Sequence, residues 1–289
     1  MHFVKVKNIL TGANNGMNVY RGCVHGCVYC DTRSKCYGFT HALEDVEVKE
    51  NAVELLDYAL THKRKKCMVG TGSMADQYQP IENELFITRK CLEVILKHNC
   101  GATMITKSDL VLRDLDILRE INSRTKCVVQ ITLTCTDDKL SKIIEPNVCT
   151  TNERIKVLEI LKQNNIPTVV WLSPILPFIT DTEENIKNIL EACVMNNVKG
   201  IICFGMGMTL RDGNREYFYS FLDRFNPELK QRYITEYGNS YQLASPNNTE
   251  LMQMHFETCN KYNIISSPND VFAYLNEFPQ KEKQLSLFQ

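Results

Sequence analysis

The sequence predicts an α/β protein, a partial (βα)6 barrel of the TIM type followed by an α-rich C-terminal extension. Two patterns lead to this prediction. Short apolar runs rich in β-branched residues alternate with longer stretches of helical spacing, and this alternation repeats six times. Strands separated by helices form parallel sheets with right-handed crossovers. The pattern changes at Arg211, before the further units that a closed eight-unit barrel needs.

The elements follow one another with boundaries that local signals support. Ser108, Asn152 and Asp181 stand where helix N-caps belong, with acidic residues in the turns that follow. The expected strands are residues 17–20, 67–70, 102–106, 127–134, 168–172 and 201–204. The expected helices are residues 52–61, 82–98, 109–122, 152–163 and 181–195.

We divide the chain into three parts. Residues 1–210 form the barrel, and residues 211–278 form an extension packed on it, with helices at 249–262 and 269–278. Residues 279–289 are expected to be a flexible tail. No Gly/Ser-rich linker and no fixed-period repeat separates these parts.

Composition excludes several classes of protein. Hydrophobic residues make up 44% and charged residues 23%, with a net charge of −1, which is typical of a globular chain and not of a disordered one. No apolar run reaches the ~18 residues of a membrane span, and the N-terminus lacks secretory-leader features. We therefore expect a cytoplasmic protein without a membrane partner. The net charge gives no support for non-specific nucleic-acid binding, although a local basic groove is compatible with it.

Three of the thirteen cysteines form a compact motif. Cys23, Cys27 and Cys30 have the spacing C-x3-C-x2-C, which lets three thiolates hold one face of a metal cluster. Three ligands to a four-iron cube leave one iron open, as in catalytic metal sites. The alternative is a structural zinc site with His25 or Cys36 as the fourth ligand. The other cysteines lie mostly on apolar faces and are expected to be buried, with an auxiliary cluster as the alternative.

This motif, placed after the first strand of an α/β barrel and with Tyr29 before its last cysteine, resembles the radical S-adenosylmethionine (SAM) superfamily. The longer string Tyr20-Arg21-Gly22-Cys23, then His25-Gly26-Cys27 and Tyr29-Cys30-Asp31, resembles the relatives of spore photoproduct lyase, a DNA repair photolyase-like family. The resemblance continues at residues 79–82, 106–108, 145–146 and 173–177.

The resemblance implies the cofactors and their ligands. A [4Fe-4S] cluster on Cys23, Cys27 and Cys30 would bind SAM, and one electron would cleave SAM to a 5′-deoxyadenosyl radical that abstracts hydrogen from a substrate. Such sites lie at the carboxyl ends of barrel strands. The expected cofactor-binding residues are Tyr29, Ser73, Lys107 and Thr132.

Each of these side chains has a structural alternative. Lys107 can extend its ammonium from a strand end towards water. Ser73 and Thr132 suit turns at strand ends. Glu82 fits a SAM contact or the first turn of a helix. Arg154 is expected on the solvated face of its helix.

One departure from the family affects the function. Spore photoproduct lyase carries a hydrogen-donating cysteine after the second strand, whereas residues 70–76 of this chain contain no cysteine. Tyr37 and Tyr78 are the candidate donors. We expect a radical SAM enzyme acting on a nucleic-acid substrate such as a DNA pyrimidine lesion, with an electron donor such as flavodoxin or ferredoxin. The alternatives are modification of a peptide, a tRNA or a small molecule, and a non-enzymatic metal-binding module.

The C-terminal segment Gln284-Leu285-Ser286-Leu287-Phe288 resembles the sliding-clamp-binding motif of bacterial replication and repair proteins. A short apolar segment near a chain end suits docking into a groove of a partner. The alternative is that Leu285, Leu287 and Phe288 pack on their own domain. If the segment binds the DNA sliding clamp, Leu287→Ala/Phe288→Ala should abolish clamp binding in a pull-down, and unchanged binding would refute the idea.

Overall fold

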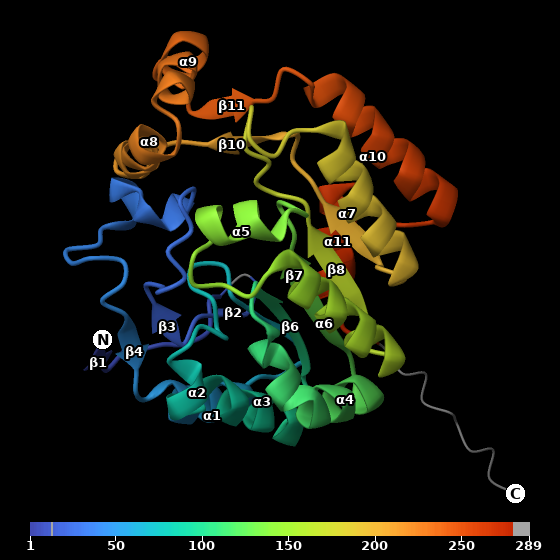
Figure 1. Cartoon of the computed structure of the whole chain (residues 1–289). Coiled ribbons are helices and arrows are strands. Elements are labelled where there is room, and N and C mark those ends of the chain that lie inside the picture. Colours follow the sequence, from blue (N-terminus) through green and yellow to red (C-terminus); the bar gives the residue numbers. More distant parts are fainter. Residues whose placement is uncertain (13, 280–289) are drawn as a thin grey trace, which may run out of the picture.

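The protein is described here by a computed structural model that covers residues 1–12 and 14–279. A six-stranded sheet forms its centre, and its strands follow chain order as β2-β5-β6-β7-β8-β9 with every neighbouring pair parallel (Figure 1). This confirms the partial barrel. The strands are β2 (Gly16–Met17), β5 (Met68–Thr71), β6 (Gly101–Thr106), β7 (Cys127–Thr132), β8 (Thr168–Trp171) and β9 (Gly200–Ile202).

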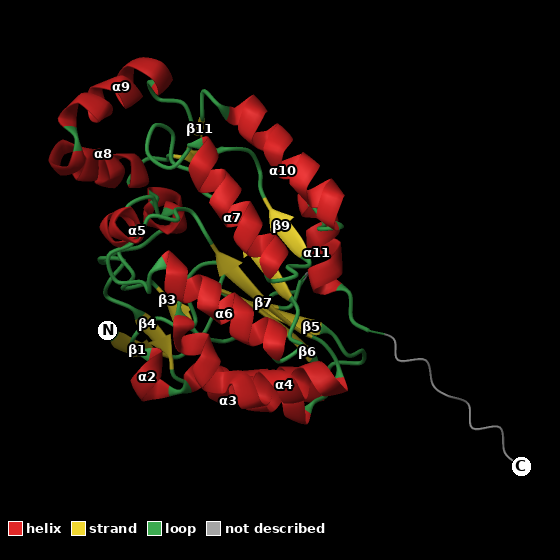
Figure 2. Cartoon of the chain, turned by 45° about the vertical axis from the view of Figure 1, so that its right-hand side comes forward, coloured by secondary structure: helices red, strands yellow, loops and turns green. Residues whose placement is uncertain are grey.

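Helices cover the outer face of this sheet (Figure 2). Each buries an apolar side, as in the helix that contributes Ile117, Leu118 and Ile121 to the main core. The outer helices are α1 (Ala52–Thr61), α3 (Ile87–Lys97), α4 (Leu115–Arg124), α6 (Thr151–Gln163) and α7 (Glu183–Met195).

Helix starts differ in detail from the prediction. Ser108 does cap a helical segment, because its hydroxyl accepts a hydrogen bond from the Leu110 amide. The caps of α6 and α7 are Thr150 and Thr182 rather than Asn152 and Asp181. Thr150 forms a capping box with Glu153, a pattern that is visible in the sequence as T-x-x-E.

A small sheet beside the barrel was not predicted. It joins β1 (His2–Val4), β4 (Glu47–Lys49) and β3 (Tyr20–Arg21) in the order β1-β4-β3. The strand predicted at residues 17–20 is therefore divided between β2 of the barrel and β3 of this sheet. The short helix α5 (Asp138–Ile144), which follows β7, was also not predicted.

The two last helices of the C-terminal part pack on different sides of the sheet. Helix α10 (Asn248–Tyr262) packs along α7, and α11 (Pro268–Asn276) packs against β9. Val271 and Leu275 of α11 form a core cluster with Val128 and Val169, whereas the neighbours of these two valines in β7 and β8 face the outer helices. Side chains alternate across a strand, so α11 closes the face opposite to those helices.

Two strands cross the boundary that we predicted at residue 210. β10 (Gly207–Thr209) pairs antiparallel with β11 (Gln242–Ala244), and the helices α8 (Asn214–Phe225) and α9 (Pro227–Tyr237) lie between them in the chain. None of the helices in the described residues is long and apolar enough to cross a membrane.

The helix predicted at 82–98 is broken in two, α2 (Glu82–Leu85) and α3, by Phe86 at a φ of 55°. Glu82, which is fully buried, stabilises the break. Its carboxylate accepts hydrogen bonds from the Thr88 amide at the start of α3 (3.1 Å to each oxygen) and from the Tyr20 hydroxyl. The Arg113 guanidinium forms an ion pair with the same carboxylate, at 2.9 Å. Glu82 is thus a structural residue, and it does not line the cavity described below.

We expect Glu82→Ala to lower the free energy of unfolding by about 2–5 kcal/mol, because it leaves the buried Thr88 amide and Tyr20 hydroxyl without their acceptor, at roughly 1–3 kcal/mol each. Urea denaturation monitored by circular dichroism measures this loss. Glu84→Ala, an exposed acid of the same helix, is the matched control and should change stability by less than about 0.5 kcal/mol. Equal effects of the two substitutions would contradict the assigned role.

Candidate active site

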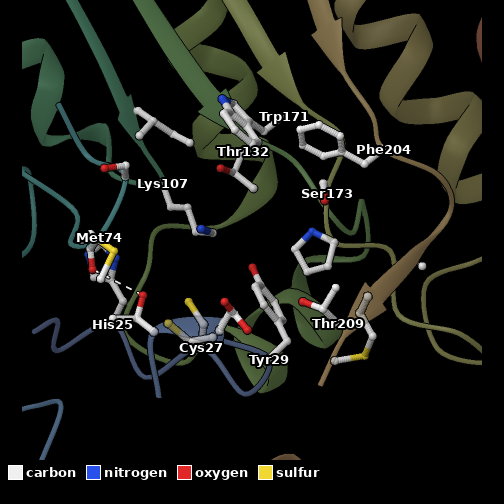
Figure 3. Close-up of a pocket in the computed structure, with 18 of the residues that line it drawn as sticks. His25, Cys27, Tyr29, Met74, Lys107, Thr132, Trp171, Ser173, Phe204 and Thr209 are labelled. Carbon is white, nitrogen blue, oxygen red and sulfur yellow. Dashed lines mark hydrogen bonds between the residues drawn. The ribbon is translucent and has the colours of Figure 1, made fainter. Parts of the chain in front are cut away.

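A cavity of about 730 Å³ lies at the carboxyl ends of the barrel strands (Figure 3). Its walls come from the cysteine loop, from the ends of β6, β7 and β8, from the loops after β5 and β9, and from the β10–β11 pair. The volume is in the range of small-molecule sites, about 300–1,000 Å³. All three cysteines of the C-x3-C-x2-C motif line it.

The cysteine loop is held in place through its backbone. The Cys23 amide donates to the Leu43 carbonyl (2.9 Å), the Val24 amide to the side chain of Gln79 (3.1 Å), and the Val28 amide to the carbonyl at the end of α5 (3.0 Å). Gly22, at a φ of 97°, has no room for a side chain, because a Cβ would stand 2.5 Å from the Leu43 oxygen. Contacts with several separate elements therefore fix the loop.

The spacing of the three thiols bears on which metal they suit. Thiolates that share one zinc lie ~3.8 Å apart, since each is about 2.3 Å from the ion. Within the described residues, the one group of three or more ligand atoms that all lie within 4.8 Å of one another is His2, His41 and Glu47. The three cysteine sulfurs do not all lie within 4.8 Å of one another, so they are more widely spaced than one zinc ion requires. Thiolates bound to different irons of a cluster are also farther apart than thiolates that share one zinc.

Of the two candidate fourth zinc ligands, His25 lines the cavity beside the cysteines and Cys36 does not. His25 lies 3.6 Å from the Asp76 carboxylate, and Cys36 is exposed, does not line the cavity and contacts Arg211 at 3.3 Å. Burial raises the pKa of Cys23 to about 12 and that of Cys27 well above its usual value. Binding of a metal centre by these thiols releases their protons. The donor set fits an iron–sulfur cluster.

Lys107 places a positive charge inside the cavity. Burial opposes this charge, but Cys27, Glu145 and Asp76 outweigh it and raise the pKa of the lysine above its usual value. The ammonium points towards Cys27 and Tyr29 (Figure 3). Among the residues that the structure describes, it has no hydrogen-bond or ion-pair partner, and its nearest aromatic contact is the Tyr29 ring at 5.9 Å. A half-buried cation without a partner in this position favours an anionic ligand.

The other predicted SAM contacts meet in the same cavity, whereas the predicted hydrogen donors do not. Ser73, Thr132 and Tyr29 all line it together with Lys107. Tyr37 lies outside the lining and donates to Asp31 at 2.8 Å. Tyr78 is fully buried beneath the cavity, with its hydroxyl 3.8 Å from a methionine sulfur.

A fully buried ion pair beneath the cysteine loop corrects the expectation for Arg154. This side chain has no exposed surface, and its guanidinium pairs with Glu145 and donates to the Thr132 carbonyl at 2.9 Å. The Tyr29 hydroxyl donates to the same carboxylate. Burial favours the neutral form of Glu145, but Arg154 and Lys107 outweigh it and lower the pKa of this carboxyl. The pair thus joins α6, β7 and the cysteine loop.

Sequence reasoning also missed an aromatic wall. Trp171, at the end of β8, and Phe204, after β9, line the cavity opposite Cys27 and Tyr29 (Figure 3). The sequence offered a weak signal, because each lies at or just after the end of an expected strand.

The fold and the site define a partial-barrel enzyme built around three thiols and a half-buried cation, and comparisons with known proteins agree. Residues 17–193 match the family model of the radical SAM superfamily. An uncharacterized protein of Methanocaldococcus jannaschii is 30% identical over 239 residues, covering 82% of this chain and 81% of that protein. An uncharacterized protein of Mycobacterium bovis is 27% identical over 248 residues, covering 82% and 71%.

Solved structures agree on the fold. A mutant spore photoproduct lyase superposes with a TM-score of 0.67 at 11% identity, covering 91% of this chain and 78% of that one. Another, with bound AdoMet and dinucleoside spore photoproduct, has a TM-score of 0.61 at 11% identity and covers 86% and 74%. The chain therefore belongs to the radical SAM superfamily. It is a radical SAM enzyme, and its cofactors are a [4Fe-4S] cluster and SAM, as the sequence predicts.

We expect Arg154→Met to lower the free energy of unfolding by about 3–5 kcal/mol and to reduce iron incorporation, because it leaves Glu145 charged and buried beneath the cysteine loop. Chemical denaturation and iron per chain after anaerobic reconstitution measure the two effects. Arg119→Met, on the exposed side of α4, is the control and should match the wild type. Normal stability with full iron loading would show that the ion pair does not support the loop.

Proposed function

We propose that Cys23, Cys27 and Cys30 hold the [4Fe-4S] cluster, and that the enzyme acts on a nucleic-acid substrate, with a pyrimidine lesion in DNA as the first candidate. One observation carries the proposal: the three thiols, the Lys107 ammonium and the hydroxyls at the strand ends meet in a single cavity. When bound, the cluster supplies the electron that cleaves SAM to a 5′-deoxyadenosyl radical, which abstracts hydrogen from the substrate.

The chain's own residues bind and orient SAM. The Lys107 ammonium, which lacks a partner of its own in the described residues, would pair with the SAM carboxylate. Ser73 and Thr132 offer hydroxyls in the lining of the same cavity. Tyr29 is fixed by its hydrogen bond to Glu145, so its ring is held against the space where SAM would lie. We assign no hydrogen donor, since neither Tyr37 nor Tyr78 lines the cavity.

Two features support a nucleic-acid substrate. The motif strings around Cys23 and Cys30 resemble the DNA repair photolyase-like family. Arg211 also lies at the rim of the cavity, where its guanidinium donates to the hydroxyl of the cavity-lining Tyr241 at 2.8 Å. Its guanidinium also lies 3.7 Å from the Asp31 carboxylate, so a phosphate would have to share this cation with Asp31. A spore photoproduct lyase of the same fold was solved with a dinucleoside, which guides the choice of first substrate.

The proposal extends to partners and location. It includes a one-electron donor such as flavodoxin or ferredoxin and a cytoplasmic location. The sliding-clamp segment at residues 284–288 lies outside the described residues, and neither the structure nor the comparisons support it. It stays a prediction from the sequence alone.

The test is anaerobic reconstitution with iron and sulfide, followed by dithionite and SAM and quantification of 5′-deoxyadenosine. The wild type should form the product, and Cys27→Ala should form none because it lacks a cluster ligand. Lys107→Met should assemble the cluster but require about ten- to hundredfold more SAM, since a hydrogen bond to a charged group contributes roughly 1.5–3 kcal/mol. Lys139→Met, an exposed lysine outside the cavity, is the control.

Substrate is then tested by adding ultraviolet-irradiated DNA, unirradiated DNA, tRNA or a peptide mixture. Stimulation of 5′-deoxyadenosine by irradiated DNA alone is the expected result. Stimulation by tRNA or peptide instead would contradict the nucleic-acid lesion and favour the corresponding alternative. Tight zinc binding with no cluster would overturn the ligand assignment.

A further inference from the structure

The aromatic wall of Trp171 and Phe204 packs on α11 through Phe272, yet part of it faces the cavity. The Phe204 side chain is 65% exposed although it is a large apolar group. It lines the same cavity as the three cysteines and stands across that cavity from Cys27 and Tyr29 (Figure 3). Exposed apolar surface of this kind is typical of a binding site.

The wall is held rigidly. The Trp171 indole donates to the side-chain oxygen of Gln130 at 2.7 Å, and the amide nitrogen of Gln130 donates to the Thr103 hydroxyl at 2.8 Å. Gln130 and Thr103 are both buried. These hydrogen bonds fix the plane of the indole. They also give both ends of the buried Gln130 amide a partner, which stabilises this polar side chain inside the barrel.

Phe204 is supported from behind by α11. Its ring stacks on Phe272 with centroids 6.3 Å apart and an angle of 28° between the planes, and Phe272 lies 6.0 Å from Trp171. Three rings therefore brace one another, and two of them present surface to the cavity. A rigid aromatic surface loses little conformational entropy when a ligand binds to it.

We propose that Trp171 and Phe204 form a stacking subsite for an unpaired nucleobase of the substrate. This inference rests on the proposed function and names the part of the site that would recognise the substrate. Stacking on aromatic side chains contributes about 1–3 kcal/mol per base and suits every base. Arg211 at the rim would meet the phosphate of the same nucleotide.

The position of the wall favours the substrate over SAM as its occupant. The side chains proposed for SAM come from the loop after β5 and from the ends of β6 and β7, next to the cysteine loop. The wall comes from β8, where Trp171 pairs in register with Thr132, and from the segment after β9, the edge strand of the sheet. It is therefore separated by one or more strands from Ser73 and Lys107 and adjoins only Thr132. A base inside a duplex cannot reach this cavity without leaving its stack, so the wall predicts a preference for single-stranded or lesion-distorted DNA.

The chain itself provides the probe. Trp171 is its only tryptophan, so fluorescence excited at wavelengths that tyrosine does not absorb reports on this wall. We would titrate the reconstituted holoenzyme, with SAM present, with ultraviolet-irradiated oligothymidylate, unirradiated oligothymidylate and the same duplexed strand. Irradiated and single-stranded probes should quench Trp171, and the intact duplex should quench it less.

Binding measured by anisotropy of the labelled oligonucleotide tests the contribution of Phe204. Phe204→Ala should weaken binding by about five- to hundredfold, in line with the loss of one stacked base, while Phe204→Tyr should retain it. Phe256→Ala, an exposed phenylalanine of α10 that does not line the cavity, is the matched control and should bind as the wild type does.

The outcomes separate this inference from the function on which it rests. Quenching by SAM alone, with Phe204→Ala weakening SAM binding and not oligonucleotide binding, would assign the wall to adenine and overturn the inference. Oligonucleotide binding that ignores Phe204 and leaves Trp171 unquenched would also overturn it, yet leave the nucleic-acid function standing. Absence of any oligonucleotide binding, in an enzyme that forms 5′-deoxyadenosine, would refute the nucleic-acid function itself.

Discussion

The buried ion pair between Glu145 and Arg154 is the interaction on which the rest of the site depends. It lies where α5, α6 and β7 meet, and its carboxylate also receives the hydroxyl of Tyr29 from the cysteine loop. A charge pair without access to water is costly unless its remaining hydrogen-bonding groups are satisfied. Ser141 and the Thr132 carbonyl satisfy most of those of the guanidinium. The pair therefore specifies one arrangement of the cysteine loop over the barrel.

The charges in the cavity depend on one another. Lys107 and Arg154 favour the ionised form of Glu145, and the surrounding carboxylates and thiols favour the charged form of Lys107. Asp76 links two loops at the same place, since its carboxylate accepts from the Thr106 hydroxyl and from the Lys107 amide. When thiolates form on metal binding, they add negative charge beside this cation. The charged form of Lys107 is therefore favoured both before and after a metal centre binds.

The sequence predicts the repeating units well because the outer helices and buried strands have clear periodicity. The prediction from sequence fails where contacts between distant residues determine the local structure. Residues 17–20 look like one short strand, but residue 17 ends β2 of the barrel and residue 20 begins β3 of the three-stranded sheet. α5 is short, so its periodicity is weak. The prediction that Arg154 faces solvent was wrong. Arg154 lies on the stripe of Val157, Leu158 and Leu161 that faces the core, and the prediction gave its charge more weight than its position on the helix.

The sequence predicts a residue of the site best when the residues that define its role lie close to it in the chain. Cys23, Cys27 and Cys30 are close in sequence, and their spacing alone indicates their chemistry. Ser73, Lys107 and Thr132 follow from the rule that parallel strands present their carboxyl ends to one edge. The partner of Tyr29 is 116 residues away, and Trp171 owes its orientation to Gln130 of another strand. No local pattern encodes such pairs.

Chemistry and recognition therefore occupy different parts of the chain. The N-terminal half of the barrel supplies the thiols and the half-buried cation, while the wall belongs to β8 and the segment after β9 and is braced by α11. The two parts face each other across the cavity and are joined where β7 pairs with β8 and Gln130 accepts the hydrogen bond of the Trp171 indole. Substitutions in the wall can alter which substrate binds without disturbing the cysteine loop, because Phe204 makes its aromatic contacts with Trp171 and Phe272. A superfamily that shares one radical chemistry among many substrates is expected to vary at this second wall, since function resides in the site and not in the fold.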